Sequence, residues 1–278
     1  MIHLFALLSL LLCSVCYTGF QNSSHFHNTS NRRSLLLLVF GGALLLRLLL
    51  AYTTHGFSND IACFAAWADR IFTLGPGQFY SAEMFTDYPP GFMYVLYLIG
   101  ALRSLLQIPY YSDLHILLLK LPAILCDIAC GFLLYREAVK RLHFSDLQGI
   151  FAASAYLFQP AVILNSSCWG QVDSVYTLMI ILMCLFLMKG NLLPAYAVYG
   201  LGVLLKPQML IFTPVLLAGI WDHVFLQDFS WRKFFYNLCG GLVVICGMLL
   251  LCAPFGLTAA ISQYTSTLGS YEYAAINA

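Results

Sequence analysis

The chain has 278 residues, of which only 9% are charged and 61% are hydrophobic. Because a soluble domain carries about 25% charged residues, this composition excludes a soluble globular protein and a globular domain with one membrane anchor. A net charge of +1 gives no basic field, so nucleic acid is excluded as a partner. The ten cysteines lie mostly inside apolar runs, where cysteine acts as a small hydrophobic residue, and they predict no metal or redox site.

Apolar segments recur along the chain at lengths close to the roughly 20 residues that cross a bilayer as a helix. They predict an all-α fold, a polytopic transmembrane helical bundle with about 8 spans and with extracytoplasmic juxtamembrane helices. The segments are residues 2–19, 34–52, 89–107, 114–135, 147–165, 173–188, 192–205, 208–221 and 235–253.

The first segment has the length of a signal-peptide core, but no basic residue precedes it, and Arg32 and Arg33 follow it. Because positive residues stay on the cytoplasmic side, we expect a retained helix with its N-terminus outside. A cleaved signal peptide is the alternative. We therefore divide the chain into an N-terminal helix with a cytoplasmic link, residues 1–33, and a transmembrane module, residues 34–278.

Basic residues orient the first half of the transmembrane module. Residues 34–52 leave the cytoplasm, which makes residues 53–113 an outer loop with amphipathic helices. Residues 114–135 end in the basic cluster that begins at Arg136 and therefore return to the cytoplasm. An odd number of crossings must lie between the outer loop and this basic cluster. We therefore expect residues 89–107 to lie in the outer interface; a further crossing is the alternative.

The same rule orients the second half. Residues 147–165 run outward, so the CWGQVDS stretch that follows lies at the outer surface. A lysine at the middle of one long helix is costly to bury in a membrane. We therefore predict two short passes that turn at Lys206 and Pro207, and residues 235–253 then run outward again.

Four polar elements thereby reach the outer membrane boundary. They come from distant parts of the chain, and their shared depth follows from the basic residues alone. We infer that they line one site. The elements are Asn59 with Asp60, the DYPP stretch at 87–90, the WGQVD stretch at 169–173 and the KPQ stretch at 206–208.

Asp60 precedes an amphipathic stretch, IACFAAWADRIF. Its apolar residues recur at intervals of three and four, which predicts a helix on the membrane surface with Asp69 and Arg70 toward water. A carboxylate at that boundary can deprotonate an acceptor hydroxyl, so Asp60 is the candidate general base. Its alternative role is to cap the helix. The apolar face comprises Ile61, Phe64, Ala65, Ala68, Ile71 and Phe72.

Three cations are candidates for binding a lipid phosphate. Lys206 lies in the same outer layer as the acids, and Lys120 supports it from inside its own helix. Arg47, near the outer end of its helix, either pairs with Asp127 or joins the phosphate site. For Lys206 and Arg47 the alternative is snorkelling, in which the charged end reaches the headgroups.

The remaining polar residues are candidates for substrate binding. The two prolines after Tyr88 fix a rigid elbow that forms one wall of a cavity, although prolines also suit the start of a helix. Trp169 and Gln171 suit recognition of a sugar face, while tryptophan also anchors proteins at interfaces. Asp173 begins a helix, where its alternative role is capping. The predicted substrate-binding set is Asp87, Tyr88, Trp169, Gln171, Asp173 and Gln208.

The motifs SND at 58–60, YPPGFMYVL, WGQVDS and LLKPQ together resemble the GT-C fold of integral-membrane glycosyltransferases, and most closely bacterial mannosyltransferase-like proteins related to the second GPI mannosyltransferase. The likeness runs from Leu44 to Ala278. It implies that a sugar, with mannose as the guess, moves from a polyprenyl-phosphate donor to a hydroxyl of a lipid, glycan or protein acceptor. Asp60 then matches the catalytic acid, and Lys206 lies near the lipid phosphate. Family members continue with more helices, so we expect a chain that is short at its C-terminus.

Members of that family can use a divalent cation. This chain has the single acid Asp60 in place of a doubled acidic motif, so we predict no metal ligand and leave a divalent cation open as a cofactor. We expect an integral protein of a bacterial plasma membrane with an extracytoplasmic active site; an endoplasmic reticulum protein would show the same geometry. The rival functions are a transporter or lipid flippase and a non-catalytic GT-C-like scaffold. Polar residues that gather at one face, without an internal repeat, favour the enzyme.

Overall fold

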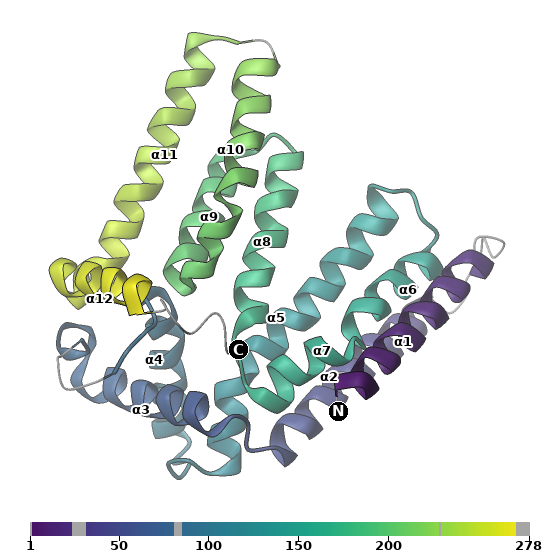
Figure 1. Ribbon diagram of the computed structural model, residues 1–278, viewed down its shortest axis with the longest axis horizontal. Coiled ribbons are helices and arrows are strands. Elements are labelled where there is room, and N and C mark those ends of the chain that lie inside the picture. The colour runs from purple at the N-terminus through teal and green to yellow at the C-terminus, as the bar shows by residue number, and fades with distance from the viewer. Residues whose placement is uncertain (1, 24–31, 81–84, 228, 271–278) are drawn as a thin grey trace. The chain divides into compact units, whose positions relative to one another are not determined.

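The computed structural model describes residues 2–23, 32–80, 85–227 and 229–270, and these form helices and loops without a strand among them. The all-α class is therefore confirmed. Figure 1 shows the order of the helices along the chain. The chain divides into two compact units: unit 1 comprises Met1–Ala62 and Pro109–Leu178, and unit 2 comprises Cys63–Ile108 and Met179–Ala278. The boundary predicted at residue 33 stays a prediction.

The helices follow this division, except that α3 (Ser58–Leu74) and α8 (Asp173–Met188) begin in unit 1 and end in unit 2. Unit 1 contains α1 (Ile2–Ser23), α2 (Arg32–Thr53), α5 (Asp113–Lys140), α6 (Asp146–Leu157), α7 (Pro160–Ile163) and the π-helical turn η2 (Leu164–Trp169). Unit 2 contains η1 (Pro76–Gln78), α4 (Pro90–Leu105), α9 (Leu192–Leu205), η3 (Pro207–Phe212), α10 (Thr213–Trp221), η4 (Asp222–Leu226), α11 (Trp231–Cys252), η5 (Ala253–Phe255) and α12 (Leu257–Ser270).

The number of spans is lower than the predicted figure of about 8. In the part of the chain that the structure describes, 4 helical stretches are long and apolar enough to cross a membrane, or 5 if a pair bent by 53° is one span. The prediction was wrong in part because α8 and α9, which were counted as spans, are apolar but only 16 and 14 residues long. The 4 stretches are Arg32–Thr53, Asp113–Lys140, Pro207–Leu226 and Trp231–Phe255, and the bent pair is Asp146–Leu157 with Pro160–Trp169.

Local sequence signals set several helix ends. The Ser112 side chain accepts from the His115 amide at the start of α5, and Ser145 forms a capping box with Gln148 at the start of α6. Lys206 is extended between α9 and η3, which confirms the predicted break at this lysine. Pro207 follows it at the first helical position, where a missing amide proton costs nothing.

In unit 1, α2 packs against α5 and α6, and α1 packs against α6 (Figure 1). Gly131 lets α5 approach α6 closely, because an added Cβ atom would lie 2.6 Å from the Leu157 side chain. The buried core between these helices is apolar except for the phenol of Tyr135. Its members are Ala43, Tyr135, Ile150, Ala153 and Leu157.

A buried ion pair joins the helices of unit 1. Arg47 of α2 and Asp127 of α5 have fully buried side chains, and the Nε atom of Arg47 lies 3.2 Å from Oδ2 of Asp127. Arg47 also donates to the carbonyl oxygen of Leu157, at 2.7 Å, and to that of Ala43 in its own helix. The pairing with Asp127 is one of the two roles predicted for Arg47, and its phosphate contact stays a prediction.

Three hydroxyl groups complete the environment of the Asp127 carboxylate. Ser166 donates to Oδ2 at 2.6 Å, while Tyr156 and Ser174 donate to Oδ1 at 3.2 and 2.5 Å. A buried carboxylate is tolerated only when it is paired and its oxygens are hydrogen-bonded. Because these donors come from α6, η2 and α8, the one acid connects most of unit 1.

The predicted amphipathic helix is α3, and its apolar face is confirmed. Five of the six predicted residues are buried, while Phe72 is half-buried against Tyr97. Asp69 and Arg70, which were predicted to face water, are half-buried, and the Asp69 side chain keeps 40% of its surface exposed. Asp69 forms an ion pair with Arg103 of α4, and Arg70 donates to the carbonyl oxygens of residues 78 and 79 in the following loop. Both charged side chains have partners in the protein because α4 and this loop pack against their side of α3.

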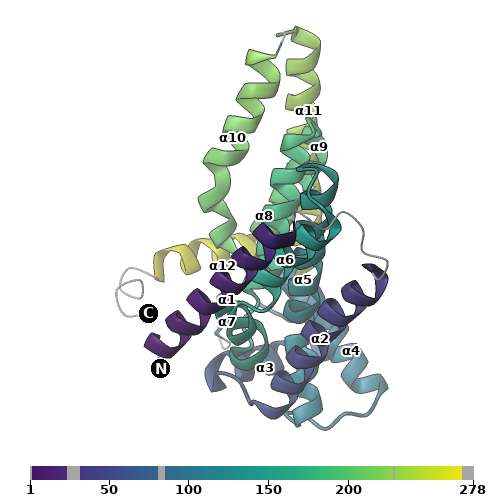
Figure 2. The ribbon, with the colours of Figure 1, turned by 90° about the vertical axis from the view of Figure 1, so that its right-hand side faces the viewer.

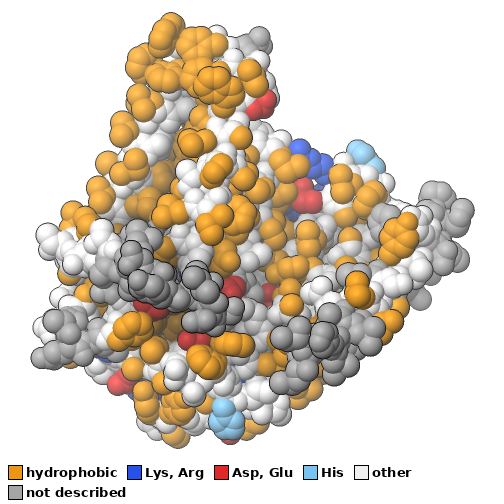
Figure 3. Space-filling view, viewed as in Figure 1, with side chains coloured by type: hydrophobic (Ala, Val, Ile, Leu, Met, Phe, Trp, Pro, Cys, Tyr) orange, Lys and Arg blue, Asp and Glu red, His pale blue; other side chains and the backbone are white. Residues whose placement is uncertain are grey.

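In unit 2, α9 packs against α11, as Figure 2 shows, and also against α4. Met183, Tyr196, Met209 and Leu216 belong to the buried core around α9. The opposite side of α11 stays exposed: Val243 and Leu250 have exposed fractions of 65% and 74%. Figure 3 shows apolar side chains along this helix. An exposed apolar surface on a span-length helix is suited to contact with lipid.

We predict that Arg47→Met lowers the free energy of unfolding by about 3–5 kcal/mol, because it leaves the buried Asp127 charge without its cation. Unfolding of the purified full chain in detergent, followed by its helical signal, measures the change. Arg32→Gln is the control, since Arg32 pairs with Asp146 but its side chain is 52% exposed, and exposed pairs contribute about 1 kcal/mol or less. Equal effects of the two substitutions would contradict the central role of the buried pair.

Candidate functional site

The start of α3 lies against the loop that follows η2. The Phe57 amide donates to the Trp169 carbonyl oxygen at 2.8 Å, and the centroids of the two rings lie 5.2 Å apart. Gly170 has a φ of +90°, and a Cβ atom there would lie 2.6 Å from the Ile61 side chain. Glycine is therefore required at 170, both for the left-handed backbone and for the close approach of the loop to α3.

Asp60 binds two side chains of this loop through one carboxylate oxygen. Its Oδ2 atom accepts from Nε1 of Trp169 at 3.0 Å and from Nε2 of Gln171 at 2.5 Å. These three residues form the Asp60 site. Asp60 is the third residue of α3, so it lies inside the first turn and bonds to side chains of the loop rather than capping the helix.

The Asp60 site has two acceptor oxygens with no donor among the residues that the structure describes. One is Oδ1 of Asp60, and the other is the buried Oε1 of Gln171. Trp169 lies beside them with 51% of its surface exposed. A carboxylate acceptor next to an exposed aromatic face can bind a ligand that carries several hydroxyl groups.

Lys120 lies next to Gly170 and caps the C-terminal end of α2. Its ammonium group donates to the carbonyl oxygen of Ala51 at 3.2 Å, and to the carbonyl and hydroxyl oxygens of Thr54 at 2.6 and 3.1 Å. An ammonium group has three donors, and these acceptors use all of them. Lys120 therefore stabilises the negative end of the α2 dipole. The predicted phosphate contact stays a prediction, and it would require Lys120 to leave these carbonyls.

Asp173 supports the same loop from the start of α8. Its Oδ2 atom accepts from Nδ2 of Asn165 at 3.0 Å. The backbone oxygen of Asn165 in turn accepts from the amides of Gly170 and Gln171, at 3.1 and 3.0 Å. Asp173 thus contributes to the position of Gln171 through Asn165. A direct contact between Asp173 and substrate stays a prediction.

The other predicted residues lie in unit 2. The Tyr88 ring packs against Phe64 and Trp67, and the Lys206 ammonium lies 5.8 Å from the centre of the Tyr88 ring. Tyr80 donates to the Tyr88 carbonyl oxygen at 3.0 Å. Burial raises the pKa of Tyr80, so its phenol keeps the proton that this hydrogen bond needs.

The YPPG elbow is therefore held in place by an aromatic cluster. Asp87 is half-buried, and Gln208 is exposed. The structure brings Asp60, Trp169 and Gln171 together in unit 1, and separately Tyr88 and Lys206 in unit 2. Their predicted roles in substrate binding stay predictions.

Sequence reasoning missed the hydroxyl groups around the two buried charges. Thr54, Ser166 and Ser174 carry hydrogen bonds to Lys120 or Asp127, yet each looks like an ordinary small residue at the end of an apolar run. The usable signal was the intramembrane acid itself, since a buried carboxylate needs several donors. The described residues also contain no group of three His, Cys, Asp or Glu side chains that could share a metal ion.

Comparison with known families gives a match that covers most of the chain. Residues 33–273 match the model of the family described as GPI transamidase subunit PIG-U. No curated protein matches the chain.

This match overturns the predicted polyprenyl-phosphate glycosyltransferase. The family is described as a subunit of a transamidase, an enzyme that forms an amide bond rather than transferring a sugar. The match supports an integral membrane protein of a GPI-related family, and it lends no support to the predicted bacterial plasma membrane.

We predict that Lys120→Met lowers the free energy of unfolding by about 2–3 kcal/mol, because it leaves buried carbonyl oxygens at the end of α2 without donors. Unfolding in detergent measures the effect. Lys140→Met is the matched control on the same helix, since Lys140 is exposed at the end of α5. If Lys120→Met unfolded no more easily than Lys140→Met, Lys120 would not have the capping role assigned to it.

Proposed function

Because the chain belongs to the PIG-U family, we propose that it is a membrane-embedded subunit of a GPI transamidase whose Asp60 site binds the glycan of the substrate. A GPI molecule is a glycan joined through phosphate to a lipid. A subunit with several span-length helices meets the lipid part in the bilayer, and a polar site at the end of those helices meets the glycan.

The observation that carries this proposal is the arrangement of the Asp60 carboxylate beside the exposed face of Trp169. One oxygen is fixed by two donors, so the carboxylate has a defined orientation before a ligand arrives. The other oxygen is then directed to accept from a hydroxyl group. The buried Oε1 of Gln171 has no donor among the described residues, and an unsatisfied buried acceptor costs about 1–3 kcal/mol. A ligand that donated to this oxygen would remove that cost.

The same contacts favour a binding role over catalysis of the acyl transfer. A transamidase needs a nucleophile with a general base within hydrogen-bond reach. Among the described residues, Asp60 bonds to an indole and an amide, neither of which is a nucleophile. We therefore assign the covalent chemistry to another subunit. An extracytoplasmic position of the Asp60 site remains a prediction from the basic residues.

Asp60→Asn tests this function. The substitution keeps the size of the side chain but removes the charge, and hydrogen bonds to charged groups contribute about 1.5–3 kcal/mol. We expect the transamidase complex that contains the variant to bind GPI at least tenfold more weakly, and cells that depend on it to show less of a GPI-anchored reporter. Binding of labelled GPI to the purified complex and the surface level of the reporter are the two measurements.

Asp113→Asn is the matched control. Asp113 also belongs to unit 1, but its side chain is 55% exposed and lies 3.6 Å from the exposed His55. Co-purification of the other subunits shows whether each variant still assembles. An Asp60→Asn complex that assembled and bound GPI as tightly as the wild type would eliminate the Asp60 site as the glycan site.

A further inference from the structure

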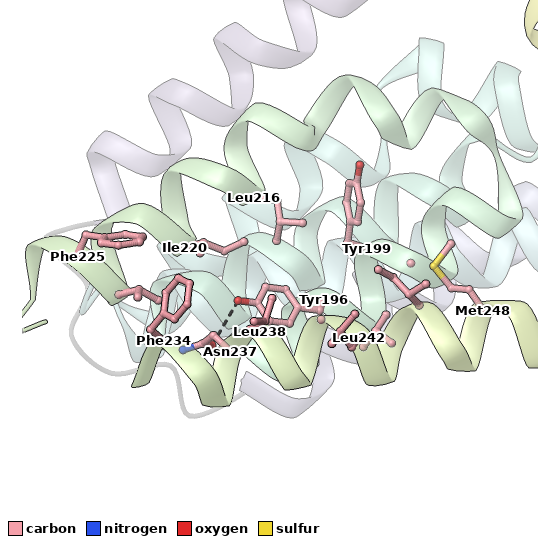
Figure 4. A pocket seen from close by; sticks show the side chains of 15 residues that line it. Tyr196, Tyr199, Leu216, Ile220, Phe225, Phe234, Asn237, Leu238, Leu242 and Met248 are labelled. Carbon is pink, nitrogen blue, oxygen red and sulfur yellow. Dashed lines mark hydrogen bonds between the residues drawn. The ribbon is translucent and has the colours of Figure 1, made fainter. Parts of the chain in front are cut away.

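Unit 2 contains an apolar groove between α9, α10 and α11, termed here the α11 groove. Its volume is about 400 Å³. Figure 4 shows Tyr196, Leu216, Leu242 and Met248 among the side chains that line it. The few polar groups in the lining have partners: Tyr196 donates to Oδ1 of Asn237 at 3.3 Å, and Tyr199 bonds to Thr213. The groove therefore offers an apolar surface to whatever fills it.

A second cavity of about 410 Å³ lies at one end of this groove and shares Asn237 with it. Three of its lining residues, Arg232, Lys233 and His223, are basic. Lys233 donates to the Gln227 carbonyl oxygen at 3.0 Å. Arg232 is exposed and makes no ion pair with any acid that the structure describes. The cavity thus has a cationic side, whereas the α11 groove is apolar.

Aromatic rings place this end of unit 2 at a membrane surface. Trp221, Phe225, Phe229 and Trp231 form a continuous series with ring centroids 4.7, 5.7 and 5.2 Å apart. Trp221 and Trp231 stand at the two ends of this series, and tryptophan is enriched where a membrane meets water. The cationic cavity therefore lies at headgroup depth, and the α11 groove lies among the lipid tails.

The groove is long enough to cross the hydrocarbon of one leaflet. It follows α11 from Phe234 to Met248, and this stretch spans about 21 Å at roughly 1.5 Å per residue. The hydrocarbon of one leaflet is half of about 30 Å. The groove is apolar along this length and has the cationic cavity at one end, so it suits a single acyl chain joined to an anionic headgroup.

We propose that the α11 groove and the cationic cavity together form a binding site for an anionic phospholipid. One acyl chain fills the groove between α9, α10 and α11, and the phosphate lies against Arg232 and Lys233. Basic pockets between membrane helices recognise anionic headgroups in this way. By the rule that positive residues stay inside, the lipid belongs to the cytoplasmic leaflet. This site is independent of the Asp60 site and of the GPI proposal.

A glycine on α11 allows the groove to be filled without a clash. A Cβ atom at Gly241, which lines the groove, would meet no other atom within 4 Å. Gly241→Leu therefore puts a side chain where the acyl chain lies. Gly247→Leu is the matched control, since Gly247 also has no atom within 4 Å of an added Cβ but lies outside the groove. Native mass spectrometry of the purified complex, with phosphatidylserine or phosphatidylcholine added, counts the bound lipids.

We expect Gly241→Leu to lose the bound phosphatidylserine that the wild type and Gly247→Leu retain. The double variant R232Q/K233Q should bind phosphatidylserine roughly 30-fold more weakly, because each basic residue near a membrane surface contributes about a fivefold attraction. Its weak binding of phosphatidylcholine should not change. K140Q/R141Q, a basic pair at the end of α5, is the control for a general loss of positive charge.

Three results would contradict the proposal. Unchanged retention of phosphatidylserine by Gly241→Leu would show that no acyl chain occupies the groove. A partner subunit that dissociates from Gly241→Leu while lipid binding stays intact would show that the groove holds a protein helix instead. Equal losses of both lipids in R232Q/K233Q would remove the headgroup assignment.

Discussion

The ion pair between Arg47 and Asp127 is the constraint on which the rest of unit 1 depends. A carboxylate in an apolar helix has a large desolvation cost unless it is paired and hydrogen-bonded. The donors to Asp127 come from α2, α6, η2 and α8, so this cost is offset only when those elements meet at one point. Lys120 lies seven residues earlier on α5, close to two helical turns. The geometry that satisfies Asp127 thereby brings Lys120 to the end of α2, from which the chain leads into the Asp60 site.

The sequence predicts the features that depend on neighbouring residues. The apolar periodicity of α3, the break at Lys206 and the link between Arg47 and Asp127 follow from local spacing or from the cost of a lone buried charge. The number of spans does not follow, because an apolar run shows neither where a helix ends nor how far it tilts. The contact between Asp60 and Gln171 joins residues 111 positions apart. It depends on the left-handed backbone of Gly170, which no local pattern in WGQVDS reveals.

The resemblance to glycosyltransferases rested on motifs that turn out to have structural tasks. The glycine of YPPG lets α4 approach α9, since an added Cβ at Gly91 would lie 2.6 Å from the Leu204 carbonyl oxygen. The glycine of WGQVDS allows the loop beside α3, and the lysine and proline of LLKPQ separate α9 from η3. Motifs that set turns and close approaches identify an architecture. They do not identify its chemistry, because one architecture hosts many functions. The predicted reaction failed for this reason, while the predicted helical architecture held.

The two proposed sites differ in charge, and this difference has a consequence for lipid selection. The Asp60 site presents a carboxylate oxygen, which attracts hydroxyl donors and repels phosphate. The cationic cavity at the α11 groove presents Arg232 and Lys233, which attract phosphate and gain little from neutral hydroxyls. A GPI molecule carries both groups on one chain, so its glycan and not its phosphate should contact Asp60. An anionic phospholipid without a glycan offers Asp60 fewer hydroxyl donors, so it should bind the Asp60 site more weakly than GPI does. Such lipids would then fill the α11 groove without competing with the GPI substrate for the Asp60 site.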